Sequence, residues 1–275
     1  MYNRPPAPPD PFALPVPPQG YESNSNTNGL TLCAPISTAE KNIVIIAAGQ
    51  SLVANTSGAL YVPANVTKVN NVNIYDGASY RVGGPMLSCS NSTIGPGNLC
   101  AYLADRFITN GIADRVWIAP IGVGGTAVAD WQAGGFCNSK IDVTMRRLAS
   151  RGITPATPNT YFVFCWAQGE TDNERGTSQA AYTASLHSML SSLTASGFSG
   201  RVFINLETLF TGGTAAGIRA AQVSVVNNTT IFQGGDLDTL TGGTNRQPDF
   251  HLTAAGASAA ATLMYNAIHV TGAPF

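Results

Sequence analysis

From residue 42 onward, short apolar runs alternate with segments of helical periodicity, and this alternation limits the fold more than any other feature of the chain. Such a pattern is the sequence form of βαβ units, which build a parallel sheet covered by helices on both faces. Because the runs are apolar throughout, we expect strands that are buried on both sides. The expected strands are 42–48, 115–121, 161–167, 201–206 and 229–232.

Helices are expected between these runs. Large apolar residues recur at helical spacing over 99–107 and 141–148, and a glycine follows each stretch closely. Further helices are expected over 178–194, 214–226 and 253–269. The segment 51–98 is rich in Asn, Gly, Ser and Pro and is interpreted as loops at a functional edge.

The N-terminal residues 1–29 have a different composition from the rest. They hold eight of the 17 prolines and end in a polar run rich in Asn and Ser. Such a composition gains little from packing, so we expect an extended tail or a plain linker. A docking arm that tethers the domain to a larger assembly is the alternative. Residues 30–275 are expected to form one domain.

The charge content excludes several classes of partner. Only 11% of the residues are charged and the net charge is −1, so the chain has no basic stripe for nucleic acid. No apolar stretch approaches the ~18 residues of a membrane span, and the N-terminus lacks the apolar core of a secretory signal. Solubility must come from Ser, Thr, Asn, Gln and Gly, a balance that favours an extracellular or virion-associated protein over a cytoplasmic one.

The numbers and spacing of the cysteines and histidines limit the metal sites and disulfides that the chain can form. The chain has five cysteines without C-x-x-C spacing and three histidines, which excludes a zinc finger or ribbon. An odd number leaves at least one thiol outside intramolecular bridges. Cys89 and Cys100 flank a loop that a disulfide could close, whereas Cys165 lies in an expected buried strand and is expected to be a free thiol.

Chemistry-bearing segments follow the expected strands, at the edge where open α/β sheets bind ligands. The first strand runs into Gly49-Gln50-Ser51, which presents a serine hydroxyl after a sharp turn. This is not the G-x-S-x-G elbow of α/β-hydrolases, because Val53 occupies the last position. The segment 165–172 ends another strand with amide and carboxylate groups. His251 directly precedes the last helix and has an acidic neighbour in Asp249.

The glycine-rich segment 121–131 admits two interpretations. Gly122, Gly124 and Ala127 fit the tolerant dinucleotide pattern G-x-G-x-x-A. A dinucleotide site would also need a helix that opens at once and an acidic residue at the end of the following strand, whereas here a Gly134-Gly135 loop follows and Asp142 falls inside a helical pattern. A loop whose N–H groups face a developing negative charge fits better. A nucleophile, oxyanion donors and a histidine together indicate acyl transfer.

These segments resemble the four sequence blocks of SGNH (GDSL-type) hydrolases. The residues that carry the likeness are Gly49-Gln-Ser51, the loop 123–126 followed by Trp131, the run 166–172, and the acid and histidine before Leu-Thr-Ala-Ala-Gly256. They look like the branch of sialate O-acetylesterases and acetylxylan esterases, and the likeness covers residues 42–268. It implies a flavodoxin-like three-layer α/β/α sandwich with a five-stranded parallel sheet, and no metal or organic cofactor.

The resemblance also implies roles for individual residues. Ser51 would be the nucleophile and His251 the general base, with oxyanion donors from the N–H groups of Ser51 and Gly125 and the amide of Gln168. Trp131 and Glu170 would bind substrate. The family usually places an aspartate three residues before the histidine, where this chain has Pro248. Asp249 is therefore the candidate third triad member, and a Ser-His dyad supported by a backbone carbonyl is the alternative. Leu52 stands where the branch often has asparagine.

The expected function is serine-dependent removal of O-acetyl groups from a carbohydrate such as acetylxylan, sialic acid or another acetylated polysaccharide. An acetylated carbohydrate is then the expected partner, and no nucleic acid or membrane is involved. Two alternatives remain from the sequence: a short-chain lipase or thioesterase of the same fold, and a non-catalytic carbohydrate-binding or virion module.

Overall fold

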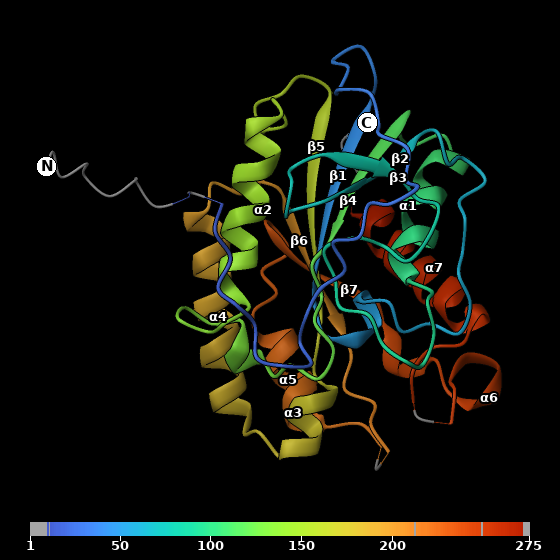
Figure 1. Cartoon of the computed structure of the whole chain (residues 1–275). Helices are drawn as coiled ribbons and strands as arrows, with labels where there is room; N and C mark the ends of the chain where they lie inside the picture. The colour runs from blue at the N-terminus through green and yellow to red at the C-terminus, as the bar shows by residue number, and fades with distance from the viewer. Residues whose placement is uncertain (1–9, 11, 212, 249, 272–275) are drawn as a thin grey trace, which may run out of the picture.

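The computed structural model describes residues 10, 12–211, 213–248 and 250–271, and it has the three-layer α/β/α architecture expected from the sequence (Figure 1). A seven-stranded sheet forms the middle layer. Its strands are β1 (Asn42–Gly49), β2 (Val69–Val72), β3 (Ser79–Arg81), β4 (Arg115–Pro120), β5 (Thr160–Ala167), β6 (Arg201–Leu206) and β7 (Ile231–Asp236).

The strand order is β3-β2-β4-β1-β5-β6-β7. The five expected strands are all present and form the contiguous block β4-β1-β5-β6-β7, in which every neighbouring pair is parallel. This is the flavodoxin-like order 2-1-3-4-5. β2 adds a sixth parallel strand beside β4, and β3 pairs antiparallel with β2.

The strand β2 is not predicted from the sequence because two of its four residues are asparagines. Their side chains are buried, and the Asn71 side-chain oxygen accepts a hydrogen bond from Leu87 N at 2.6 Å. A strand that buries polar side chains lacks the apolar run by which buried strands are recognised. The segment 51–98 is therefore only partly loop, and the sheet is two strands wider than the expected five.

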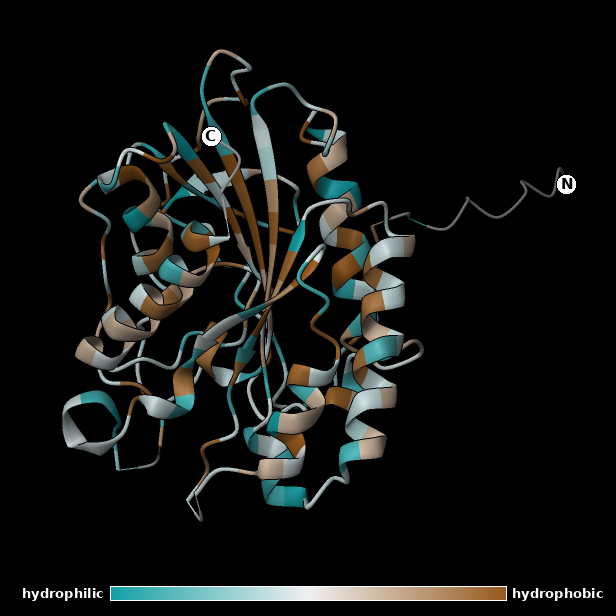
Figure 2. Cartoon of the chain, turned by 180° about the vertical axis from the view of Figure 1, so that it is seen from behind, coloured by the Kyte–Doolittle hydropathy of each residue, from teal (hydrophilic) through white to brown (hydrophobic). Residues whose placement is uncertain are grey.

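Helices cover both faces of the sheet. They are α1 (Leu99–Thr109), α2 (Asn138–Ser150), α3 (Glu170–Arg175), α4 (Gln179–Ala195), α5 (Ala216–Ser224), α6 (Gly242–Asn245) and α7 (Ala254–Val270). One face packs against α1 and α7 and the other against α2, α4 and α5, so two apolar cores form (Figure 1). Figure 2 shows the apolar strands, in brown, between helices on which hydrophobic and hydrophilic residues alternate as bands of colour. No helix of the described residues is long and apolar enough to cross a bilayer.

Residues 12–29 lie against the domain and do not extend away from it as a tail. Ser23 bridges Ser90, Tyr21 packs on the ring of Phe136 with centroids 5.3 Å apart, and the buried Lys140 ammonium donates to Ser23 Oγ at 2.6 Å. Burial lowers the pKa of Lys140 to about 8. Residues 1–9, on which the tethering expectation also rests, lie outside the described residues.

The cysteines are free thiols, so the disulfide considered between Cys89 and Cys100 is absent. Both side chains are buried in the core that α1 helps to form, and burial raises the pKa of the Cys89 thiol to about 12. Cys165 is a buried thiol, as expected. A buried neutral thiol behaves as a small apolar side chain and is chemically inert.

Candidate functional site

The candidate site lies at the carboxyl ends of β1 and β5, where the chain reverses its direction of travel across the sheet. In the order 2-1-3-4-5 this is the topological switch point, at which the loops diverge and leave a crevice. Gly49 makes the turn out of β1 with φ +131°, and a Cβ atom on it would overlap Ala167 O of β5. The turn places Ser51 at the start of a short 3₁₀ helix, directly above the sheet.

Gln50 ties the end of β1 to the loop that follows β5. Its side-chain oxygen lies 3.2 Å from Gly169 N, Thr171 N and Gln168 Nε2, all of which donate to it. Its amide nitrogen donates to Glu170 Oε2 at 2.6 Å. One amide side chain thus holds the first turn of α3 against the serine turn.

Glu170 lies next to Ser51, on the side that faces the protein interior. Ser51 Oγ donates to Glu170 Oε2 at 3.1 Å, and the guanidinium of Arg246 lies 3.8 Å from Glu170 Oε1. The carboxyl group is 1% exposed. Burial raises the pKa of Glu170 to about 7, against the opposing effects of Arg246 and the Ser51 hydrogen bond. Glu170 was expected to bind substrate, but it supports the serine from inside the protein.

A second carboxyl group, Glu207, lies at the end of β6 next to Glu170. Its side chain is fully buried, and burial together with the charge of Glu170 raises the pKa of Glu207 well above its ordinary value. The side-chain amide of Gln222 donates to the Glu207 backbone oxygen at 3.1 Å. A buried pair of carboxyl groups near one guanidinium retains a proton at neutral pH, because two negative charges would outnumber Arg246.

The glycine-rich loop after β4 borders the serine on its other side. Gly124 N donates to Ser90 Oγ at 2.9 Å, and a Cβ atom on Gly124 would lie 3.7 Å from Ser51 Cβ. Gly125 has φ +73°, and a Cβ atom on it would lie 3.8 Å from the Tyr21 ring. The N-terminal segment therefore places an aromatic side chain beside the loop that was expected to supply an oxyanion donor.

Gln168 does not have the geometry expected of an oxyanion donor. Its side chain is fully buried, and Nε2 lies within hydrogen-bond distance of Gln50 Oε1 (3.2 Å), Thr126 O (3.1 Å) and Asp172 Oδ2 (2.5 Å). An amide nitrogen has two hydrogens, so these acceptors use both. Gln168 holds the loops after β4 and β5 together.

Trp131 does not border a substrate site either. Its side chain is 0% exposed, its N–H donates to Thr126 Oγ1 at 3.0 Å, and its ring packs edge-on against Trp166. A ring with its polar atom satisfied five residues away and both faces covered belongs to the core. The aromatic side chain next to the glycine loop is Tyr21 instead.

His251 lies on a segment that is anchored to the serine turn. Gln247 Nε2 reaches Thr56 O at 3.4 Å, and Thr56 Oγ1 donates to Ser51 O at 2.6 Å. The imidazole is 8% exposed and stacks on the Phe250 ring with centroids 4.5 Å apart. Asp249, the candidate third triad member, lies outside the described residues.

Several site residues were not singled out from the sequence. Glu207 follows an expected strand directly, so the rule that identified the other segments also applied to it. Arg246 lies in a loop without a motif, and its three donor bonds to Leu240 O, Leu237 O and Phe250 O depend on the fold. Among the described residues, no cluster of three or more His, Cys, Asp or Glu side chains could hold a metal ion.

Comparison with known proteins places the fold. No family model and no curated protein matches the sequence. Among solved structures, an Arabidopsis thaliana protein is similar with a TM-score of 0.61 and 16% identity, over 86% of this chain and 99% of that one. A carbohydrate acetylesterase from Xanthomonas citri is similar with a TM-score of 0.53 and 13% identity, over 83% of this chain and 56% of the other.

A member of the lipolytic G-D-S-L family from Veillonella parvula also matches, with a TM-score of 0.46 and 14% identity. The chain shares its α/β/α fold with the Xanthomonas citri acetylesterase. At these identities the likeness concerns the fold, so the chemistry has to be argued from the site itself.

Proposed function

We propose that this protein is a serine ester hydrolase of the SGNH type that removes O-acetyl groups from a carbohydrate. The observation that carries the proposal is the position of Ser51: a hydroxyl at the topological switch point, held by Glu170 at 3.1 Å and bordered by a glycine-rich loop. The carbohydrate part rests on the acetylesterase fold neighbour and on the sequence resemblance.

The proposed reaction uses few groups. His251 accepts the Ser51 proton, Ser51 Oγ attacks the acyl carbonyl, and the N–H groups of Ser51 and Gly125 stabilise the oxyanion. The Gly124 N–H is already donated to Ser90, which leaves its neighbour Gly125 for this role. His251 then gives the proton to the departing alcohol oxygen as the C–O bond breaks. Water releases acetate from Ser51 through the same groups.

Glu170 has a distinct part in this scheme. In the resting enzyme the Ser51 hydroxyl donates to Glu170 Oε2, which fixes the rotamer of the serine. For catalysis the proton must be redirected to His251, and protonation of Glu170 removes the acceptor charge that competes for it. Asp249 is proposed to orient His251, with the dyad as the alternative.

The test is hydrolysis of p-nitrophenyl acetate by Ser51→Ala and His251→Ala, since the members of a catalytic triad act as one unit. Each variant should lose at least about a hundredfold in turnover with unchanged circular dichroism. Ser191→Ala and His187→Ala, exposed positions on α4, are the matched controls. More than a tenth of wild-type turnover in Ser51→Ala would falsify the proposal.

The substrate class needs its own measurement. Acetate release from acetylxylan and from O-acetylated sialic acid should depend on Ser51, and p-nitrophenyl acetate should be cleaved without metal addition. Release from neither carbohydrate, with Ser51-dependent cleavage of p-nitrophenyl acetate, would keep the esterase and exclude these sugars as its substrates.

A further inference from the structure

A cleft of about 630 Å³ lies between the loop after β6 and the segment that leads into α7. This volume is within the ~300–1,000 Å³ of small-molecule sites. The residues that shape it are Leu209, Phe210, Arg246, Gln247, Pro248 and Phe250. None of them was singled out as a binding residue from the sequence.

The cleft adjoins the candidate site on its histidine side. Phe250 forms part of its wall and stacks on His251. Arg246, also in the wall, lies 3.8 Å from Glu170, which accepts the Ser51 hydrogen bond. One lining residue therefore contacts a proposed catalytic residue directly, and another contacts the carboxyl group that accepts from Ser51.

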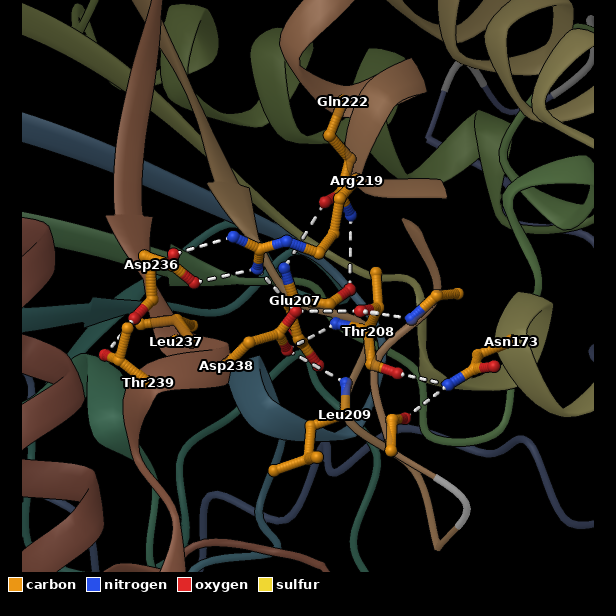
Figure 3. Close-up of polar contacts among 12 residues, drawn as sticks. Asn173, Glu207, Thr208, Leu209, Arg219, Gln222, Asp236, Leu237, Asp238 and Thr239 are labelled. Atoms are coloured by element: carbon orange, nitrogen blue, oxygen red, sulfur yellow. Dashed lines mark hydrogen bonds and ion pairs between the residues drawn. The ribbon is translucent and has the colours of Figure 1, made fainter. Parts of the chain in front are cut away.

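One wall of the cleft is fixed by an ion-pair network (Figure 3). Asp238 accepts from Thr208 N at 2.7 Å and from Leu209 N at 2.9 Å. Arg219 donates to Asp238 at 2.7 Å and forms two hydrogen bonds with Asp236. The backbone that leads into Phe210 is thus held before any ligand arrives, which lowers the entropic cost of binding.

Three polar side chains of the opposite wall already donate hydrogen bonds to the protein. Gln247 Nε2 donates to Leu252 O at 2.9 Å, and Thr253 Oγ1 donates to Thr244 O at 2.6 Å. The guanidinium of Arg246 donates to three backbone carbonyls. These groups offer few hydrogen bonds to a ligand, so a strongly polar occupant would lose hydration without replacement.

What the cleft does offer is apolar surface. The rings of Phe210 and Phe250 lie with centroids 4.8 Å apart and a tilt of 56°. Phe250 has φ +74°, a conformation that bulky residues rarely adopt. Arg246 Nη1 bonds the Phe250 carbonyl at 2.9 Å and supports that backbone. A flat ring with an apolar face matches such a pair of phenylalanines.

We infer that this cleft binds the alcohol portion of the ester, and that this portion presents an apolar ring face to Phe210 and Phe250. The inference rests on the proposed function. In serine-histidine hydrolysis the histidine protonates the leaving oxygen, so the alcohol lies on the histidine side and the acyl oxygen on the oxyanion side. The ring can be a carbocycle or the C–H face of a sugar, since both share this chemistry.

The experiment compares cyclohexylmethyl acetate with ethyl acetate. Both are acetates of primary alcohols, so the leaving-group chemistry is matched and only the ring differs. Wild-type enzyme should prefer the cyclic ester by about tenfold or more in kcat/KM, and Phe210→Ala should remove most of that preference. Ethyl acetate cleavage should fall by a much smaller factor than cyclohexylmethyl acetate cleavage in Phe210→Ala, because ethanol has no ring to lose. Phe232→Ala is the matched control, because Phe232 lies at the amino end of β7, whereas the cleft lies beyond the carboxyl ends of the strands.

The outcomes distinguish a failure of the cleft assignment from a failure of the proposed function. An unchanged preference in Phe210→Ala, or no preference in wild type, overturns the cleft assignment while Ser51-dependent cleavage stands. Cleavage that does not depend on Ser51 overturns the proposed function itself. If Phe210→Ala fails to fold, inhibition of p-nitrophenyl acetate hydrolysis by cyclohexylmethanol in wild type is the second test, and its absence counts against the cleft.

A further arm identifies the ring. Methyl 6-O-acetyl-glucoside is compared with the two simple acetates in wild type and in Phe210→Ala. Cleavage at the level of the cyclic ester, with the same loss in the variant, supports the cleft with a sugar ring as occupant. Cleavage at the level of ethyl acetate supports it with a carbocyclic ring.

Discussion

Raising the pH should destabilise this protein through Glu170, and the size of the effect follows from its burial. The unfolded chain releases this proton near the ordinary value of 4.5, whereas the folded protein keeps it until about pH 7. Between these values the folded state binds more protons. The contribution of Glu170 to the free energy of unfolding is therefore complete below pH 4.5 and is lost as the pH rises through about 7. At about 1.4 kcal/mol per pH unit, this interval amounts to a loss of about 3 kcal/mol.

The assay is urea denaturation of wild type and Glu170→Gln between about pH 5 and about pH 8. Wild type should lose about 3 kcal/mol of unfolding free energy more than the variant over this range, because glutamine does not ionise. The retained proton of Glu207 contributes in the same direction in wild type, and its pKa should fall in the variant, where the charge of Glu170 is absent. Glu174→Gln, exposed on the same helix, should follow the wild-type curve. Parallel curves for wild type and Glu170→Gln would refute the reasoning.

Four shorter predictions concern the site and the core. Gly49→Ala should cost about 3 kcal/mol or more in a denaturation assay, since the new methyl overlaps Ala167 O, whereas Gly83→Ala, with open space around it, should be nearly neutral. Thiol titration of the denatured, unreduced protein should count all five cysteines as free; a count of three would restore one bridge. Because Ser51 is only 4% exposed, specificity should fall from p-nitrophenyl acetate to butyrate and octanoate, by about 10-fold or more per poorly fitting step, and a rise would indicate a lipase. Asp249→Asn should lower turnover by up to ~10⁴-fold if it orients His251, and a loss below tenfold would favour the dyad.

The sheet and the location of the serine could be predicted because they depend on local patterns. The runs that became β1, β4, β5 and β6 are apolar throughout, which is what burial on both faces requires. Parallel strands end at the same edge, so Ser51 and Glu170 could be expected at one edge of the sheet once the strands were recognised. Their hydrogen bond is a consequence of the strand order β1-β5.

The roles of single side chains could not be predicted in the same way. Composition does not say which way a ring points, so Trp131 was interpreted as a binding residue although its N–H is satisfied by Thr126 and its ring is in the core. The engagement of Gln168 depends on Asp172, which lies one helical turn further on and faces it only because α3 begins there. Such side-chain contacts depend on the three-dimensional arrangement of the elements and do not follow from the sequence pattern.

The docked N-terminal segment has a consequence for the order in which the chain acquires its structure. Residues 12–26 leave the ribosome before their partners Cys89, Ser90, Phe136 and Lys140, which follow some 60 to 120 positions later. During synthesis the segment must wait, solvated, while the sheet assembles, and its prolines and asparagines keep it from aggregating meanwhile. Tyr21 can reach the glycine loop only after residues up to about 140 have been made. The site is therefore completed by a contact between distant parts of the chain as well as by the pairing of the strands.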